Sequence, residues 1–261
     1  TKVTGPARSL DWIRNGPPTL DRANIRAAIE GSLKRLQTDY IDIYQLHWPE
    51  RNTPMFGDFL YDPAKERPFT PPRETLEALA ELVDEGKIRY IGLSNEWPWG
   101  LMQFLNAARE YQLPRVVSVQ NAYSLLNRTW EIAMLECCHR EQIALLPYSP
   151  MAFGLLSGKY LRNPQARGRV TEFDGFAQRY SKPGVPEAVA AYAALAEAHG
   201  LSPAQLALKF VYSRWFAAST IIGATSLAQL EENLDAWDAP WSEALEQAVA
   251  DIRLRWFNPA P

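Results

Sequence analysis

His47 stands in the most informative context of all the residues in this chain that could take part in chemistry. It follows the strand-like apolar run YIDIYQL and precedes Trp48 and Pro49. An imidazole is the side chain whose protonation and hydrogen bonding are most easily tuned near neutral pH. Because parallel α/β proteins keep their reacting groups at the carboxyl ends of strands, His47 is a candidate catalytic residue. The alternative is a core histidine that ends a strand.

The residues at the ends of the other predicted strands are mostly polar. They are Lys2, Ser94, Asn95, Gln120, Tyr148, Ser149, Ala224 and Thr225. If the strands curl into a barrel, these residues surround its mouth. An amine, an imidazole, amides, hydroxyls and an aromatic face suit a planar, polar ligand that carries a carboxamide. Since strand ends are polar in most proteins, an ordinary solvated rim is the alternative.

Short β-rich runs alternate with helical patterns, which predicts βαβ units and a parallel sheet in an α/β protein. The predicted strands cover residues 2–3, 41–46, 88–93, 116–119, 143–147 and 220–223. Apolar stripes predict the helices between them: Ile25, Ile29, Leu33 and Leu36; Leu76, Leu79 and Leu82; Leu101, Phe104, Leu105 and Ala108; Ile132, Leu135 and Cys138; Leu206 and Phe210 after Ser202; Leu230 and Leu234 after Ser226. We expect one domain over residues 1–261, with long functional loops at 49–72 and 149–185.

The composition, 47% hydrophobic and 22% charged, is typical of a soluble globular protein. A net charge of −3 without a long basic run argues against nucleic acid as a partner, and no apolar stretch approaches the roughly 20 residues of a membrane helix. The two cysteines, Cys137 and Cys138, are adjacent, which excludes a disulfide framework and favours a reducing compartment, the cytoplasm. Because His47, His139 and His199 are scattered, we expect no metal site.

Five stretches of the chain, in order, resemble the aldo-keto reductases, and most closely their bacterial and potassium-channel β-subunit-like branch. They are GSLKRLQTDYIDIYQLHWPE (31–50), ELVDEGKIRYIGLSN (81–95), VQNAYS (119–124), LLPYSPMAFGLLSGKY (145–160) and IIGATSLAQLEENL (221–234). The resemblance implies a (β/α)8 barrel of the TIM type that binds a nicotinamide dinucleotide without the glycine-rich Rossmann fingerprint, which this sequence lacks. It also implies NADP-dependent reduction of an aldehyde or ketone, a small-molecule carbonyl substrate, by hydride transfer.

The resemblance assigns roles to two candidate catalytic residues. Lys2 corresponds to the lysine that lowers the pKa of a catalytic tyrosine, an effect expected of a nearby cation. His47 corresponds to the histidine that orients the substrate carbonyl and hydrogen-bonds its oxygen as negative charge develops.

The resemblance also implies three groups of cofactor-binding residues. Those at the nicotinamide are Ser94, Asn95, Gln120 and Tyr148, which stacks on the ring. Those at the pyrophosphate are Ser149, Pro150, Met151, Ala152, Phe153, Lys159 and Arg169, and those at the adenosine end are Gly223, Thr225, Gln229, Glu232 and Asn233. Many family members have an arginine in place of Gln229 and a lysine in place of Gly223, but the branch that this chain most resembles tolerates glutamine there and mostly uses NADP. The resemblance therefore implies NADP, with NAD as the alternative cofactor. Without the flanking motif, Lys159 and Arg169 would be interpreted as solvated loop charges.

Aromatic side chains from the loops are expected to wall the substrate pocket. The first candidates are Trp48, Phe56 and Trp97, and the further ones are Phe59, Tyr61 and Trp99. Such walls favour apolar or aromatic aldehydes and ketones. The alternative for each of them is packing in the core.

The sequence departs from the family at one motif. Asp-x-Ala-x-x-Tyr-Gly, which supplies an aspartate and the catalytic tyrosine upstream of the lysine, does not occur here. We therefore expect an incomplete barrel with strands 3 to 8 only, an amino-terminally truncated chain that lacks the first two βα units and is inactive by itself. One alternative is a non-catalytic nicotinamide-nucleotide-binding regulatory or scaffold module. Another is a degraded gene product that folds poorly. The sequence predicts neither the physiological substrate nor the oligomeric state.

Overall fold

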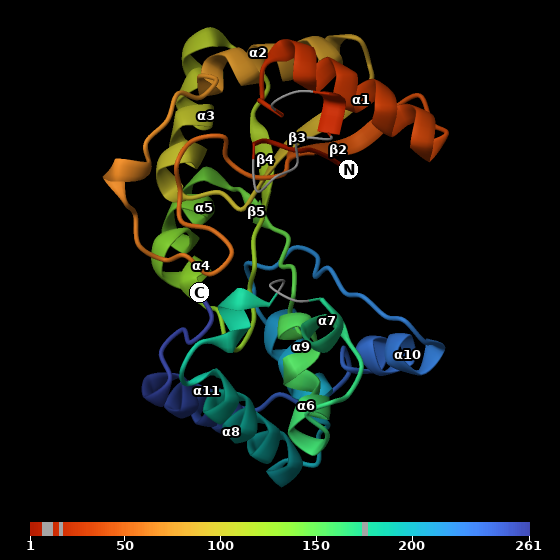
Figure 1. Ribbon diagram of the computed structural model, residues 1–261, viewed down its shortest axis with the longest axis vertical. Coiled ribbons are helices and arrows are strands. Elements are labelled where there is room, and N and C mark those ends of the chain that lie inside the picture. The colour runs from red at the N-terminus through yellow and green to blue at the C-terminus, as the bar shows by residue number, and fades with distance from the viewer. Residues whose placement is uncertain (7–12, 16–17, 174–176) are drawn as a thin grey trace. The chain divides into compact units, whose positions relative to one another are not determined.

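The computed structural model describes residues 1–6, 13–15, 18–173 and 177–261 (Figure 1). Its internal contacts group the chain into two compact units. The first comprises residues 1–53, 60–121 and 136–144, and the second comprises residues 54–59, 122–135 and 145–261. The single domain expected over residues 1–261 stays a prediction.

The sheet has the strand order β1-β2-β3-β4-β5. Its strands are β1 (Lys2–Val3), β2 (Ile41–Leu46), β3 (Ile88–Ser94), β4 (Val116–Gln120) and β5 (Ala144–Leu145). The pairs β1 with β2, β2 with β3, and β3 with β4 are parallel. The α/β class with a parallel sheet is therefore confirmed. That these strands are strands 3 to 8 of an incomplete barrel stays a prediction.

Two sets of residues in register across β1 to β4 face opposite sides of the sheet, because side chains alternate along a strand. The apolar set is Val3, Leu46, Leu93 and Val119, all of them buried. The other set is Lys2, Gln45, Gly92 and Ser118. His47, Ser94 and Gln120 each come two residues after a member of the second set, and so fall on the same side of the sheet as that set. We call this side the polar face.

Helices of the first unit cover the apolar side of the sheet (Figure 1). They are α1 (Arg22–Leu36), α2 (Pro72–Asp84) and α3 (Pro98–Tyr111), while α5 (Leu135–Glu141) begins at the boundary of the two units. The Asp21 side chain caps α1 by accepting a hydrogen bond of 2.8 Å from the Asn24 amide. The predicted stripes on the first three helices are buried, apart from the exposed Leu36. These predictions are confirmed because apolar spacing, a local signal, determines each of the three helices.

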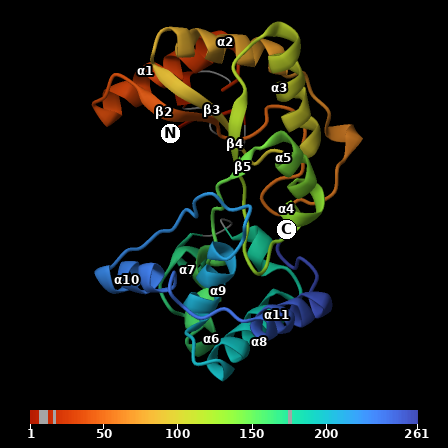
Figure 2. The same ribbon diagram turned by 180° about the vertical axis from the view of Figure 1, so that it is seen from behind.

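The second unit is mainly helical, and Figure 2 shows α8, α9 and α11 packed together. Its helices are α4 (Thr129–Ala133), α6 (Lys159–Arg162), α7 (Arg169–Glu172), α8 (Val185–Ala198), α9 (Pro203–Tyr212), α10 (Leu227–Asp235) and α11 (Glu243–Arg255). Four short 3₁₀ helices occur in the described parts of the chain: Ile13–Asn15, Pro63–Lys65, Ala152–Ser157 and Gln178–Ser181. The predicted caps of α9 and α10, Ser202 and Ser226, are confirmed, since their hydroxyls accept hydrogen bonds from Gln205 and Gln229 amides.

The sixth predicted strand, residues 220–223, is wrong. This segment has no strand structure; it follows an isolated bridge between Leu145 and Ala217 and makes one backbone hydrogen bond, from the Ile221 amide to the Pro147 carbonyl at 2.8 Å. The Ile221 side chain is 41% exposed, so the segment lacks the apolar cover that stabilises a strand.

The fourth predicted helix, with Ile132, Leu135 and Cys138 on one stripe, is confirmed only in part: the region is helical and Cys138 is buried, but the helix is interrupted. The chain turns at Met134 into two shorter helices, α4 and α5. Met134 is buried whereas Ile132 is 61% exposed, so Met134 occupies the place in the core that was expected for Ile132. In α10 too, Leu230 and Leu234 are exposed, and the buried residue is Asn233.

Candidate active site

Hydrogen bonds bring four of the predicted site residues of the first unit together at the carboxyl ends of β2, β3 and β4. The Ser94 hydroxyl donates to the Gln120 carbonyl at 2.8 Å. The Asn95 side-chain amide donates to the His47 carbonyl at 2.8 Å and to the Ser94 hydroxyl oxygen at 3.2 Å. Asn95 also has a positive φ of 53°, which is uncommon for a residue other than glycine. The strand ends are therefore fixed to one another rather than being a loosely solvated rim.

His47 lies in a half-buried position between β1 and Trp48. Its amide donates to the Val3 carbonyl at 2.9 Å, and its Nδ1 lies 3.5 Å from the Thr4 hydroxyl. The rings of His47 and Trp48 are 4.2 Å apart between centroids and inclined by 33°. Burial, and then the positive charge of Lys2, lowers the pKa of His47 from 6.5 to about 4. The imidazole is therefore neutral near pH 7.

Lys2 lies on β1 opposite Gln45, on the polar face of the sheet. Burial lowers the pKa of its amine from the ordinary value. Thr4, two residues after Lys2, is held by Arg14, whose guanidinium donates to the Thr4 carbonyl at 2.7 Å and to the Asn24 side chain at 2.7 Å. Because Asn24 lies on α1, this helix anchors Thr4 through Arg14.

The loop predicted to hold the pyrophosphate has an unusual backbone in the second unit. Positive φ angles occur at Ser149 (56°), Ala152 (49°), Phe153 (58°) and Gly154 (92°). Backbone hydrogen bonds close the tight turns, from Ala152 to Ser149 at 2.9 Å and from Gly154 to Met151 at 2.8 Å. Such a cluster of left-handed residues is found at functional loops, where successive amides can converge on an anion.

The two predicted cations of this loop, Lys159 and Arg169, lie beside it. The Lys159 amine donates to the Arg167 carbonyl at 3.1 Å, and the Arg169 guanidinium lies 4.9 Å from the centre of the Phe153 ring. Tyr148, which precedes the loop, is half-buried, and this burial raises the pKa of its hydroxyl. The position of Pro150 is buried at the start of the first turn.

At the predicted adenosine end, the loop before α10 is closed by its own side chains. Gln229 Oε1 accepts hydrogen bonds from the Thr225 amide at 2.8 Å and from the Thr225 hydroxyl at 3.0 Å. The buried Asn233 donates to the Gly223 carbonyl at 3.2 Å, and Glu232 accepts from Ser202 at 2.7 Å. Gly223, Thr225 and Gln229 are exposed and open to a ligand.

The predicted pocket aromatics fall into both units. In the first unit Trp48 is buried and Trp97 is half-buried, whereas in the second Phe56 lies 6.0 Å from the Arg179 guanidinium. The further candidates Phe59, Tyr61 and Trp99 are largely exposed. Their role in a substrate pocket stays a prediction.

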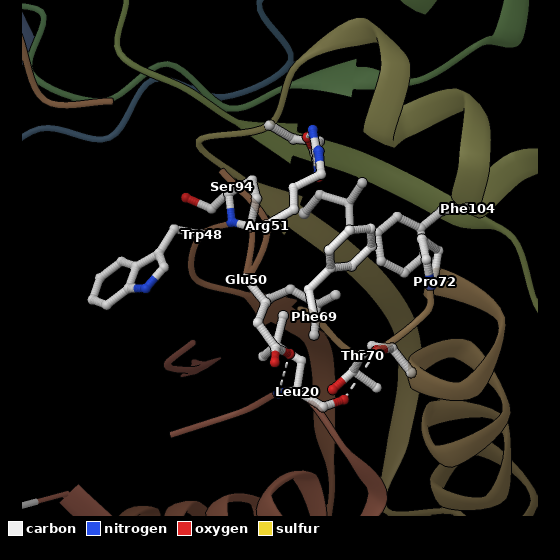
Figure 3. Close-up of a pocket in the computed structure, with 14 residues that line it drawn as sticks. Leu20, Trp48, Glu50, Arg51, Phe69, Thr70, Pro72, Ser94 and Phe104 are labelled. Carbon is white, nitrogen blue, oxygen red and sulfur yellow. Dashed lines mark hydrogen bonds and ion pairs between the residues drawn. The ribbon is translucent and has the colours of Figure 1, made fainter. Parts of the chain in front are cut away.

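A small cavity in the first unit is lined by residues that include Trp48, Glu50, Arg51, Phe69 and Ser94 (Figure 3). Its volume of about 20 Å³ fits a single water molecule rather than a substrate. In Figure 3 the Glu50 carboxylate points toward Leu20, whose amide donates to it at 2.8 Å, while the Arg51 side chain points the opposite way.

Sequence reasoning missed two charged residues of this region, Arg51 and Glu96, which form a buried ion pair. Arg51 follows the HWPE motif, and Glu96 follows the SN pair of IGLSN. Their places directly after two predicted site motifs were the one signal available, because two charges 45 residues apart have no detectable periodicity.

Within the described ranges, no group of three or more His, Cys, Asp or Glu side chains could hold a metal ion. No helix that the structure describes has the length and apolar character needed to cross a membrane. Cys137 and Cys138 are both free thiols on α5, and burial raises the pKa of Cys138 to about 12.

Comparisons with known proteins match almost the whole chain. A family model described as "Aldo/keto reductase family" matches residues 1–252. Protein tas of Escherichia coli (strain K12) is 45% identical over 262 residues, which cover 100% of this chain and 75% of that protein. An aldo-keto reductase of Babesia bovis is 37% identical over 274 residues, covering 99% of this chain and 96% of that protein. L-glyceraldehyde 3-phosphate reductase of Escherichia coli (strain K12) is 29% identical over 221 residues, covering 82% and 58%.

Proposed function

Because this chain belongs to the aldo/keto reductase family, we propose that it serves NADP-dependent reduction of a small aldehyde or ketone by hydride transfer. The observation that carries the proposal is the neutral imidazole of His47, set near a half-buried amine and among side chains fixed by hydrogen bonds. This combination suits a carbonyl oxygen on which negative charge develops.

The residues present fit a nicotinamide dinucleotide phosphate. In the first unit, Ser94, Asn95 and Gln120 offer the hydroxyl and amide groups that a carboxamide needs. In the second, the left-handed turn at Ser149–Phe153, with Lys159 and Arg169 beside it, offers amides and cations suited to a pyrophosphate. The exposed Gly223, Thr225 and Gln229, together with Glu232 and Asn233, suit the adenosine end. When bound, the cofactor supplies the hydride. NAD is the alternative, since Gln229 provides no charge for a 2′-phosphate.

His47 is assigned the role of hydrogen-bond donor to the carbonyl oxygen. If the Thr4 hydroxyl donates to Nδ1, the proton of the neutral ring lies on Nε2, which can then donate to the substrate. A neutral donor with a low pKa stays in this state throughout the physiological range. Lys2 adds a positive charge that favours the developing oxyanion and any nearby hydroxyl in its ionised form.

The non-catalytic alternative, a regulatory module that binds the nucleotide, is favoured by one observation about tyrosine. Tyr44 lies on β2 beside Gln45 and so faces away from the polar face, and its side chain is fully buried. Tyr148 is half-buried, and in our assignment it packs on the nicotinamide. Neither Tyr44 nor Tyr148 is therefore suited to donate a proton to the substrate.

Titration of the purified chain with NADPH, followed by tryptophan fluorescence, tests the binding that both functions require. His47→Gln is the site variant and His199→Gln, at the end of α8, is its matched control. Reduction of 4-nitrobenzaldehyde that is lost in His47→Gln and retained in the control supports the reductase. Binding without any turnover supports the regulatory module. A flat titration contradicts both.

A further inference from the structure

The loop that follows His47 and the loop that follows Ser94 are joined by a buried ion pair. Arg51 Nη1 donates to Glu96 Oε2 at 3.1 Å, and Nη2 donates to Oε1 at 2.5 Å. The side chains of Arg51 and Glu96 are only 10% and 3% exposed. Two parallel hydrogen bonds between planar groups fix an angle as well as a distance, so the pair determines how the two loops lie relative to each other.

Neighbouring groups hold the Arg51 side chain in one place. A Cβ atom on Gly100 would lie 2.4 Å from Arg51 Nη1, so any other residue at this position of α3 would displace the guanidinium. The guanidinium also lies 5.2 Å from the centre of the Trp99 ring. Arg67 donates to the Glu50 carbonyl at 2.9 Å, which anchors the same loop on its other side. In Figure 3 the Arg51 side chain runs past Ser94.

Glu96 connects the pair to the rest of the strand ends. Its carboxylate accepts a hydrogen bond of 2.7 Å from the Trp97 amide. Its backbone exchanges two hydrogen bonds with the Asn121 side chain, at 3.0 Å and 2.8 Å, directly after β4. The loops after β2, β3 and β4 are thus tied together through Glu96.

We propose that Arg51 and Glu96 are positioning residues of the candidate active site, whose ion pair holds His47 in place relative to Ser94 and Asn95. Neither is assigned a contact with substrate or cofactor; they act through the loops. A buried ion pair adds little stability compared with two packed apolar side chains, so a fixed geometry is the gain that accounts for it here. Its relevance to catalysis rests on the proposed function, but the geometry itself can be tested without cofactor.

The test replaces both partners, Arg51→Met with Glu96→Met, because removing one alone would leave an unpaired buried charge and could unfold the protein. The pair carries no net charge, so its removal hardly changes the electrostatic field at His47. A change in the pKa of His47 then reports a change in its burial, since Lys2 is the charged group that shifts this pKa. The matched control is Arg73→Met with Glu77→Met, an exposed pair on α2.

The measurement is an NMR titration of the histidine rings in cofactor-free protein, assigned with His47→Gln. The chain has three histidines, so His139 and His199 serve as internal references. We expect the pKa of His47 to rise by about one unit toward the ordinary value of 6.5 in the double variant, and to stay unchanged in the control. We also expect the Kd for NADPH to rise about tenfold, equal to about 1.4 kcal/mol.

A double variant that folds and keeps the wild-type pKa of His47 overturns the proposal. If the double variant does not fold, the pKa of His47 is measured in Arg51→Lys, because lysine keeps the charge but cannot form the two parallel hydrogen bonds. A raised pKa of His47 in this variant supports the proposal, and an unchanged pKa overturns it. If the unmodified chain does not bind NADPH, the proposed function fails, while the titration of His47 still decides this inference separately.

Discussion

The low pKa of His47 makes the stability of the protein depend on pH in a predictable direction. In the folded chain the pKa is about 4, and in the unfolded chain it returns to about 6.5. Between these values the unfolded state binds more protons than the folded state, so the free energy of unfolding falls as the pH falls. The stabilisation is complete above about pH 6.5 and is lost progressively on the way down to about pH 4.

The magnitude follows from the size of the shift. Lowering the pKa of His47 from 6.5 to about 4 is equivalent to about 3 kcal/mol in the free energy of unfolding, at about 1.36 kcal/mol for each pKa unit. Because His47 is half-buried and partly screened by water, we expect about 1 kcal/mol of this to be lost between about pH 7 and pH 5. The variant His47→Gln removes the titrating group, so its free energy of unfolding should fall by about 1 kcal/mol less over the same interval.

The measurement is urea unfolding of both proteins, monitored by circular dichroism, at about pH 7 and pH 5. All other ionisable groups are common to the two proteins, so the difference between their losses of stability isolates His47. Equal losses of stability in the wild type and in His47→Gln would refute the assigned burial of the imidazole.

Three further substitutions test the packing of each unit by chemical denaturation. Gly100→Ala should cost about 2 kcal/mol through the clash with Arg51, although helix propensity alone would favour alanine by about 1 kcal/mol; a more stable variant would contradict the close approach. Ser202→Ala removes the cap of α9 and should cost about 1 kcal/mol, whereas no loss would mean that the cap is dispensable. Glu131→Gln leaves the Arg128 guanidinium buried without its carboxylate and should cost about 3 kcal/mol; a loss below about 1 kcal/mol would mean that water compensates the charge.

Helices with strong local signals could be predicted from the sequence. Asp21 before α1 and Ser202 before α9 are caps whose hydrogen bonds connect residues three positions apart, so the information is local. Helix α8 was not predicted, although Val185, Val189 and Tyr192 lie on its buried face at helical spacing. The other half of that face consists of alanines, Ala188, Ala193 and Ala196, which give a weak apolar signal. The strand predicted at residues 220–223 is absent because an apolar run forms a strand only where other apolar residues cover it, and Ile221 is exposed.

The candidate site could be predicted in its residue types but not in its connections. A histidine after an apolar strand was visible as a candidate, and the family motifs pointed to Ser94 and Asn95. The hydrogen bond from Asn95 to the His47 carbonyl joins residues 48 positions apart, and it depends on the pairing of β2 with β3. The depressed pKa of His47 depends on burial and on Lys2, which only the folded chain brings near. Such long-range contacts follow from tertiary structure, not from local pattern.

The glycine in the middle of the polar face has a consequence for the evolution of this sequence. A Cβ on Gly92 would lie 2.9 Å from the Ser118 hydroxyl and 3.0 Å from Cγ of Gln45, so three strands share one limited volume. Gln45 Nε2 and Ser118 Oγ are buried and have no hydrogen-bond partner among the residues that the structure describes. Any gain of size at position 92 must therefore be matched by a loss at position 45 or 118. These positions, distant in the sequence, should covary among descendants of this protein.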